Sequence, residues 1–323
     1  MYQYSGPWGK LRKRRLAMIP YARLQPGPGF QPAQAALYYL QRMVSWPSPR
    51  RTIARFLAAA VNLGQREARV APAEPLVTRA LEALREVGVA HLPPLASAPQ
   101  IQQMYDYFAA QPVLAPDGRR FALSDLPAGA PSAAYDLKTV VACPGLMEIV
   151  NSPEVLRIVS AYIGCKPTLS SLGVRWSFPS AHGVAGYQNF HRDIDDWRFL
   201  KLFVYLTDVD EGSGPHSYVH GSHRQGFAWR ASVYTHSEVE AEFGRDRIET
   251  VTGPRGATFM ADTVGVHRGG VVTHKPRLIL QAQYSILPVF AFRYAAPVPV
   301  AAAAFDVYVN RLLIEPMGGH VAF

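Results

Sequence analysis

Two residues of this sequence, His191 and Asp193, have the types and the spacing that suit the binding of a metal ion. They lie in the segment 187–197, which reads YQNFHRDIDDW. On a β-strand the side chains at positions i and i+2 point to the same side, so we expect this imidazole and this carboxylate to converge on one face. The pair would then supply two of the three ligands of a metal site built from two histidines and one carboxylate.

His267 is the best candidate for the third ligand. It follows a turn at 253–256 and an apolar strand at 258–261, so a distant strand can bring it beside the first pair. Three protein ligands fill half of an octahedral shell, and the other positions can hold a bidentate 2-oxo acid and O₂. The pattern indicates a mononuclear non-haem iron(II) oxygenase that uses a 2-oxo acid as its co-substrate.

Arg277 makes this reading more specific than a histidine and an aspartate alone. It comes ten residues after His267 and opens the apolar segment 278–286. A guanidinium group at the start of a strand can hold a carboxylate through two parallel hydrogen bonds. We therefore expect Arg277 to bind the carboxylate of the 2-oxo acid that points away from the metal.

Other polar residues near these positions have a structural interpretation as well as a functional one. Three further histidines lie close together in the sequence and could be read as a metal cluster: His216, His220 and His223. We interpret them as structural, because a zinc site usually has a tighter, closed set of ligands. For Asp195, Asp196 and Trp197 two readings stay open, since they can shape the mouth of a pocket or cap a turn.

The elements that must position these residues change character along the chain. Amphipathic helices are expected at 51–62, 73–87 and 101–110, and a helix at 146–163 is expected to split at 152–153, where a serine precedes a proline. A short strand is expected at 89–92, and the segment 111–137 reads as loop. Period-two strands follow at 168–176, 187–191, 200–207, 217–220, 258–261 and 278–286. Helices before a β core predict an α+β layout.

The segment HRDIDDWRFLKLFVYLTDV at 191–209 resembles the phytanoyl-CoA dioxygenase (PhyH-like) family of Fe(II)/2-oxoglutarate-dependent oxygenases. Members of that family carry a similar leucine-rich strand ending in a Thr-Asp pair, followed by a Pro-Gly-Ser-His turn. This chain has Gly214 and Pro215, then HGSH at 220–223, with His220 where proline is usual. The segment HRG at 267–269 and Arg277 match the second half of the family pattern. The resemblance covers residues 75–290.

The resemblance implies a role for each matched residue. His191, Asp193 and His267 would bind Fe(II), and Arg277 would hold the distal carboxylate of 2-oxoglutarate. Three further positions would contact the co-substrate: Lys138, Phe203 and Gly269. The implied fold is a double-stranded β-helix, or jelly roll, supported by N-terminal helices. The implied reaction consumes O₂ and releases succinate and CO₂, and the carboxylate of Asp193 favours hydroxylation over the halogenation of relatives that lack it.

Charge is distributed unevenly along the chain. The protein has 33 Lys and Arg against 24 Asp and Glu, and residues 1–70 contain 12 of the former and one of the latter. The densest part is KLRKRR at 10–15. Such an arm can contact an anionic membrane surface or an acidic partner. We do not expect a nucleic-acid partner, because no aromatic residue that could stack on bases is interleaved with the cluster.

Composition sets the remaining expectations. The chain is 49% hydrophobic and 18% charged, which is ordinary for a globular protein. No apolar stretch approaches the length of about 18 residues that predicts a transmembrane helix. Two cysteines outside any CxxC pair, Cys143 and Cys165, suit a reducing cytoplasm, where we expect the protein to be.

Three parts are expected: a basic, partly irregular arm at 1–70, a dioxygenase domain with a jelly-roll core at 71–290 and a C-terminal extension at 291–323. The favoured function is hydroxylation of an unactivated C–H bond in a small molecule of lipid, acyl or natural-product type. Two alternatives stay open. The chain can be a non-catalytic jelly-roll binding module, or an oxygenase that acts on nucleic acid or protein through the basic arm.

Overall fold

A computed structural model describes residues 21–65, 74–179, 188–226, 233–295, 297–301 and 305–317. It is a mixture of helices and antiparallel sheets, with most helices preceding the main strands, as the sequence predicts. The helices are α1 (Pro32–Met43), α2 (Pro47–Gln65), α3 (Pro75–Glu86), α4 (Ala98–Ala110), α5 (Leu137–Val141), α6 (Leu146–Val150), α7 (Pro153–Ile163), α8 (His236–Phe243) and α9 (Val307–Asn310).

The strands of the described residues form a large sheet and a smaller one, with a short parallel pair near the C-terminus. The large sheet has the order β1 (Val89–Leu92), β11 (Thr258–Ala261), β7 (Phe199–Tyr205), β13 (Arg277–Ser285), β5 (Thr168–Ser177), β4 (Ser132–Ala134), β2 (Val113–Leu114), β3 (Arg120–Phe121). The smaller sheet has the order β10 (Ile248–Val251), β8 (His216–Val219), β12 (His267–Gly269), β6 (Phe190–His191), β9 (Val233–Tyr234). The parallel pair is β14 (Val298–Ala301) and β15 (Ile314–Met317).

Side chains alternate between the two faces of the large sheet, as strand geometry requires. On β7, Leu200, Leu202 and Val204 join the main hydrophobic core. Phe203 and Tyr205 point the other way and pack in a second core with side chains of β8 and β10 from the smaller sheet. The two sheets therefore face each other, and the inner face of β7 is the one directed toward the smaller sheet.

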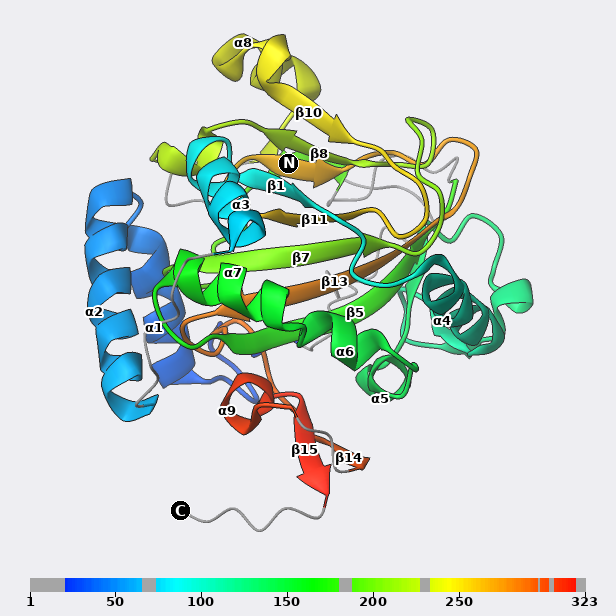
Figure 1. The fold of residues 1–323 in the computed structure, drawn as a ribbon, viewed down its shortest axis with the longest axis horizontal. Helices are drawn as coiled ribbons and strands as arrows, with labels where there is room; N and C mark the ends of the chain where they lie inside the picture. The colour runs from blue at the N-terminus through cyan, green and yellow to red at the C-terminus, as the bar shows by residue number, and fades with distance from the viewer. Residues whose placement is uncertain are drawn as a thin grey trace.

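Helices cover the outer face of the large sheet (Figure 1). On α3 the buried side chains are Val77, Ala80, Leu81 and Leu84, one stripe at helical spacing. The helix at 146–163 is split at the predicted place. Ser152 caps α7 by accepting a hydrogen bond from the Val155 backbone N–H, and Gly164 ends that helix at φ 92°. The large sheet is thus enclosed between this helical layer and the smaller sheet.

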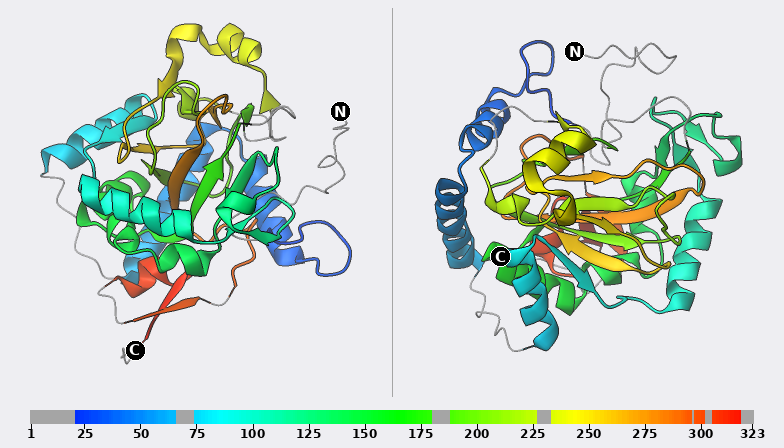
Figure 2. Two further views of the ribbon diagram at one scale, coloured as in Figure 1. Left: turned by 90° about the vertical axis from the view of Figure 1, so that its right-hand side faces the viewer. Right: turned by 90° about the horizontal axis from the view of Figure 1, so that it is seen from above.

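The two N-terminal helices contact the rest of the structure. Ala54 and Ala58 of α2 are buried in the main core. Figures 1 and 2 place α1 and α2 at one end of the large sheet and α4 at the other. Near the C-terminus, Val309 and Ile314 also join the main core. None of the described helices has the length and hydropathy needed to cross a bilayer.

Several short strands were not predicted. The segment 111–137, expected as loop, contains β2, β3 and β4. Strands β6, β9 and β12 have only two or three residues, too few for a period-two pattern to appear. Of the strand expected at 187–191, the described residues form only the two-residue strand β6, and Tyr187 lies outside the described residues. These short strands are set by pairing between distant segments.

Candidate metal centre

The smaller sheet brings His191 and His267 together. His191 ends β6 and His267 begins β12, and the two residues face each other directly across the antiparallel pair. Asp193 lies two residues beyond β6, where its backbone N–H donates to the carbonyl of Thr263 at 2.8 Å. That bond joins the segment after β6 to the segment before β12, so the three predicted ligands share one corner of the sheet.

Both imidazoles are oriented in the same way. The Nδ1 atom of His191 lies 2.9 Å from the carbonyl oxygen of Asn189, and the Nδ1 atom of His267 lies 3.0 Å from that of Gly265. A ring that donates its Nδ1–H to a carbonyl presents the lone pair of Nε2, which is the form that binds metals. Each backbone therefore fixes the tautomer that a ligand needs.

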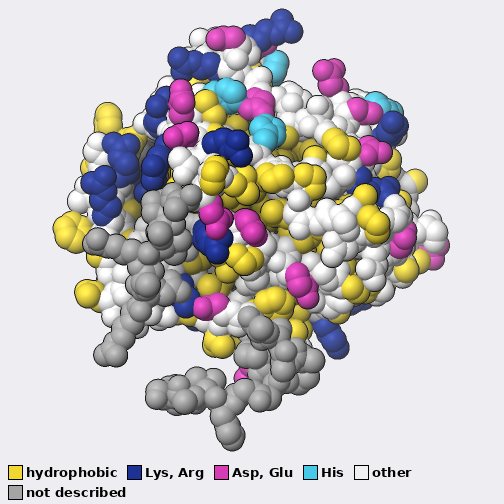
Figure 3. Space-filling model, viewed as in Figure 1, with side chains coloured by type: hydrophobic (Ala, Val, Ile, Leu, Met, Phe, Trp, Pro, Cys, Tyr) yellow, Lys and Arg dark blue, Asp and Glu magenta, His cyan; other side chains and the backbone are white. Residues whose placement is uncertain are grey.

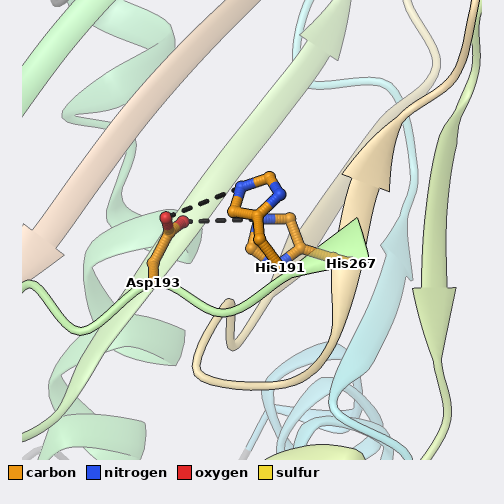
Figure 4. Close-up of side chains that lie close together, drawn as sticks. All are labelled: His191, Asp193 and His267. Atoms are coloured by element: carbon orange, nitrogen blue, oxygen red, sulfur yellow. Dashed lines mark ion pairs between the residues drawn. The ribbon is translucent and has the colours of Figure 1, made fainter. Parts of the chain in front are cut away.

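The carboxylate of Asp193 faces both Nε2 atoms (Figure 4). Its oxygens lie 3.3 Å from Nε2 of His267 and 3.8 Å from Nε2 of His191. One donor atom from each residue lies within 4.8 Å of the other two, and no other such group occurs in the described ranges. Ligands held about 2.1 Å from one ion at right angles lie about 3 Å apart, so the three donors need to move little to bind a single ion.

The protonation states also suit a divalent cation. Burial, reinforced by His267, lowers the pKa of His191 to about 4, so this ring is neutral at pH 7. Burial alone would raise the pKa of Asp193, but the ammonium of Lys201 holds it well below its usual value. Two imidazoles and one carboxylate form the donor set of a mononuclear non-haem iron site.

Lys201 is a functional residue that the sequence interpretation missed. Its side chain is 8% exposed, and its Nζ donates to Oδ2 of Asp193 at 2.6 Å and lies 3.6 Å from Oδ2 of Asp195. The available signal was one lysine inside the apolar run FLKLFVY at 199–205. Such a lysine is buried only when it is paired. Lys201 therefore holds the oxygen of Asp193 that also lies nearest to His267.

A second group surrounds His216, which is 5% exposed. Its ring stacks on His267 at a centroid distance of 5.4 Å and makes a tilted contact with the ring of Phe203 at 4.9 Å. Gly269 pairs with His216 across β12 and β8. The positive charge of Arg277 is among the groups that, after burial, lower the pKa of His216 well below its usual value. The predicted residues Phe203, Gly269 and Arg277 thus all lie around one buried imidazole beside the metal centre.

Arg277 is fixed where β13 begins. It is 2% exposed, and its guanidinium donates to the carbonyl of Gly214 and, at 3.4 Å, to the hydroxyl of Ser177. Lys138 has a different setting, because it is an exposed residue of α5 in the helical layer. The structure therefore brings six of the seven predicted site residues together and leaves Lys138 outside that group.

The remaining candidates have contacts that support the fold. The carboxylate of Asp196 accepts from the backbone N–H groups of Ile286 at 2.7 Å and Leu287 at 3.0 Å. The Nε2 atom of His220 lies 2.5 Å from Glu249, and that of His223 lies 3.3 Å from the carbonyl of Arg85. Among the described residues, His216, His220 and His223 do not form a joint group of metal-ligand atoms.

Comparison with known proteins gave structural similarities only. No family model and no curated protein sequence matches the chain. It is similar to HygX from Streptomyces hygroscopicus with nickel, 2-oxoglutarate and hygromycin B bound, at 16% identity over 70% of this chain and 92% of that one, with a TM-score of 0.47. For EctD from S. alaskensis with 2-oxoglutarate and 5-hydroxyectoine the identity is 17%, the shares are 77% and 90%, and the TM-score is 0.48.

A third similar structure is the epimerase SnoN in complex with Fe³⁺, alpha ketoglutarate and a nogalamycin compound. Its identity is 18% over 64% of this chain and 82% of that one, with a TM-score of 0.46. All three proteins are distant from this chain. The function proposed below rests on the geometry of the site itself.

Proposed function

We propose that this protein is an Fe(II)/2-oxoglutarate-dependent dioxygenase of the phytanoyl-CoA dioxygenase type, with the two sheets forming a jelly-roll core at 71–290. The observation that carries the proposal is the convergence of Nε2 of His191, Nε2 of His267 and the carboxylate of Asp193 within 4.8 Å. The substrate is a small molecule, and the default outcome is hydroxylation of an unactivated C–H bond.

The donor set fits a ferrous ion. Two imidazoles and one carboxylate leave half of an octahedral shell for a co-substrate and O₂. A closed structural zinc site would instead have four protein ligands, and the described residues offer three. Each ligand would be held in position by a further group: Asp193 by Lys201, His191 by the carbonyl of Asn189 and His267 by the carbonyl of Gly265.

The surroundings of His216 fit a 2-oxo dicarboxylic acid. The Nε2 atom of His216 is buried and has no hydrogen-bond partner among the described residues, which is costly unless a ligand supplies one. The positive charge of Arg277 acts on this imidazole, and His267 stacks on it. We infer that Arg277 holds the distal carboxylate of 2-oxoglutarate and that His216 bonds the same molecule.

Bound iron with 2-oxoglutarate and O₂ supplies an oxidant able to break an unactivated C–H bond, with succinate and CO₂ as co-products. The chain's own residues position and shield this chemistry. Phe203 stacks on Phe259 at 4.9 Å beside His216, which gives the co-substrate an apolar wall and excludes water. Asp193 occupies the ligand position that halogenation requires to be open, so hydroxylation is favoured over that outcome.

Formation of succinate from 2-oxoglutarate tests the proposal. The full chain, loaded with Fe(II) without oxygen, should form succinate only after O₂ is admitted, and Asp193→Ala should abolish this reaction. Arg277→Ala should raise the 2-oxoglutarate concentration needed by about 10- to 100-fold, because a charge-assisted contact of about 1.5–3 kcal/mol is lost. The exposed Arg119, which pairs with Asp117, gives a matched control as Arg119→Ala.

The results separate the oxygenase from its alternative. Succinate that forms equally in wild type and Asp193→Ala would contradict the assignment. A chain that forms no succinate while binding the metal normally would favour the non-catalytic binding module. The role of Lys138, the division into 1–70, 71–290 and 291–323 and the cytoplasmic location stay predictions.

A further inference from the structure

A cleft lined by arginines lies outside the candidate metal centre. It has a volume of about 430 Å³ and is bounded by the start of α2, the end of α3, the segment before β7, the turn after β8 and the segment between β11 and β12. Six arginines from these segments line it: Arg50, Arg51, Arg55, Arg85, Arg198 and Arg224. None of the three metal ligands is part of its lining.

The cleft has little negative charge of its own. Its acidic residue is Asp262, whose carboxylate accepts from the Tyr162 hydroxyl at 2.5 Å and from the backbone N–H of Val264 at 3.0 Å. This carboxylate is therefore bonded within the wall. In addition, the first turn of α2 contains no acidic residue, so the positive end of that helix dipole is not neutralised.

One of the arginines serves the fold. Arg50 is buried and donates to the backbone carbonyls of Gln41 at 2.6 Å, Val44 at 3.1 Å and Asp196 at 2.6 Å. The other five form no ion pair with any acidic residue in the described parts of the chain: Arg51, Arg55, Arg85, Arg198 and Arg224. Their charges are available to a ligand.

The gathering of these arginines needs an explanation beyond a basic surface. They come from four separate parts of the sequence, so they are not one solvated helix face. Arg85, Arg198 and Arg224 belong to residues 71–323, which contain 21 Lys and Arg against 23 Asp and Glu, whereas the three arginines of α2 belong to the basic residues 1–70. Like charges placed around one cavity repel each other, and a bound anion removes that repulsion. Figure 3 shows Lys and Arg side chains gathered where α2 begins, beside α3.

From this arrangement we infer that the cleft binds a ligand bearing phosphate groups. The planar guanidinium fork matches phosphate oxygens, and several forks around one cavity suit a diphosphate better than a single carboxylate. The ligand can be a soluble phosphorylated molecule or the headgroup of an anionic lipid. A lipid source is included because exposed apolar residues lie beside the cleft: Trp46, just before α2, is 73% exposed, and so is Phe56 of α2. The inference does not depend on the proposed function.

Calorimetric titration of the full chain with inorganic pyrophosphate tests the first source. Wild type should bind, and Arg55→Gln and Arg224→Gln should each weaken binding by about tenfold, because each removes one charge-assisted contact. Both residues are exposed, so these variants should keep the thermal stability of the wild type. Arg245→Gln is the control, since it removes the same charge from a side chain that is 90% exposed and is not part of the cleft lining.

Sedimentation with vesicles tests the second source. Phosphatidylcholine vesicles should not bind the protein, whereas vesicles that also contain phosphatidic acid should bind it if a headgroup is the ligand, with the same loss in Arg55→Gln and Arg224→Gln. Binding in either arm that falls in these two variants and not in Arg245→Gln supports the inference. Binding in neither arm, or binding that falls equally in all three variants, would overturn it.

Discussion

At the scale of single residues, the two histidines of the metal centre are held by the same device. Each donates its Nδ1–H to the carbonyl two residues earlier, that of Asn189 or of Gly265. The orientation of each ring therefore depends on local backbone and on one strand pair. Asp193 differs, because a side chain from another strand holds it. Its position depends on the buried ion pair with Lys201.

Lys201→Met should reveal this dependence. Removing the ammonium leaves two buried carboxylates, Asp193 and Asp195, without their cation, so the metal-free protein should lose about 3–5 kcal/mol of unfolding free energy. A divalent ion at the three ligands would replace part of the missing positive charge. Added Mn(II) should therefore raise the melting temperature of Lys201→Met more than that of the wild type in thermal unfolding experiments.

The exposed pair of Lys275 and Asp210 gives the control. Lys275→Met should leave the melting temperature near the wild-type value, since exposed ion pairs contribute about 0–1 kcal/mol. If Mn(II) stabilises Lys201→Met and wild type equally, Lys201 acts through packing alone and the argument about its charge is wrong.

The sequence predicted the three ligands but not the residues that support them. His191, Asp193 and His267 were found because their types and the i, i+2 spacing are visible in one dimension. Lys201 was missed because only the folded chain brings it next to Asp193. The position of a lysine within an apolar strand was nevertheless a signal that it is buried and paired. His216 was interpreted as structural, since its stacking on His267 and the influence of Arg277 on it arise only when β8, β12 and β13 are brought together.

At the scale of elements, Asp196 joins three parts of the structure. Its carboxylate accepts from the backbone N–H groups of Ile286 and Leu287, just beyond β13, and from the amide of Gln41 in α1 at 3.2 Å. Its carbonyl accepts from Arg50 of α2. Asp196 therefore connects the two N-terminal helices to the end of β13. Of the two roles considered for it, these contacts support the structural one.

Asp196 should make stability depend on pH. Burial raises its pKa to about 7, whereas the same carboxyl group in the unfolded chain titrates near 3.9, so the folded state binds more protons between these values. Stability should then fall by about 2–4 kcal/mol as pH rises from about 4 to about 7 and level off above that range. In Asp196→Asn this fall should be absent from melting temperatures measured across the same range.

Asparagine suits the site sterically and chemically. Its carbonyl can accept from Ile286 and Leu287. Its amide can donate to Oε1 of Gln41 once the Gln41 amide turns over, and this oxygen is buried and has no partner among the described residues. Asp246→Asn, at an exposed position, is the matched control. A pH dependence in Asp196→Asn that is the same as in the wild type would show that another group titrates in this window.

The helical layer was predicted better than the smaller sheet. The break between α6 and α7 was found because Ser152 and a following proline are local signals. Strand β12 was missed because its three residues gain their strand conformation by pairing with both β6 and β8. Such pairing is a property of the assembled sheet, and no pattern within three residues can predict it.

At the scale of the whole molecule, positive charge is concentrated in the basic arm at 1–70, whereas residues 71–323 have nearly equal numbers of basic and acidic residues. Deleting residues 1–50 would not test the role of this charge alone, because it would also remove the contacts that α1 and Arg50 make with Asp196. A chain beginning at Tyr21 loses KLRKRR at 10–15 and keeps these contacts. We expect it to form succinate at the rate of the full chain, because the turnover of a small molecule at the proposed site does not require the charges of the arm.

The result distinguishes two classes of substrate. Unchanged succinate formation by the shortened chain fits a small-molecule substrate. A large loss with unchanged thermal stability would show that the arm takes part in the reaction, and would favour the alternative of a polyanionic substrate.

Titration of the protein with Fe(II) in the absence of oxygen tests the metal centre most directly. The full chain should bind one ion, and His191→Ala, Asp193→Ala and His267→Ala should each abolish binding at that site. His223→Ala, which changes a histidine bonded to a backbone carbonyl, should bind as the wild type does. Wild-type affinity in any of the three ligand variants would contradict the account.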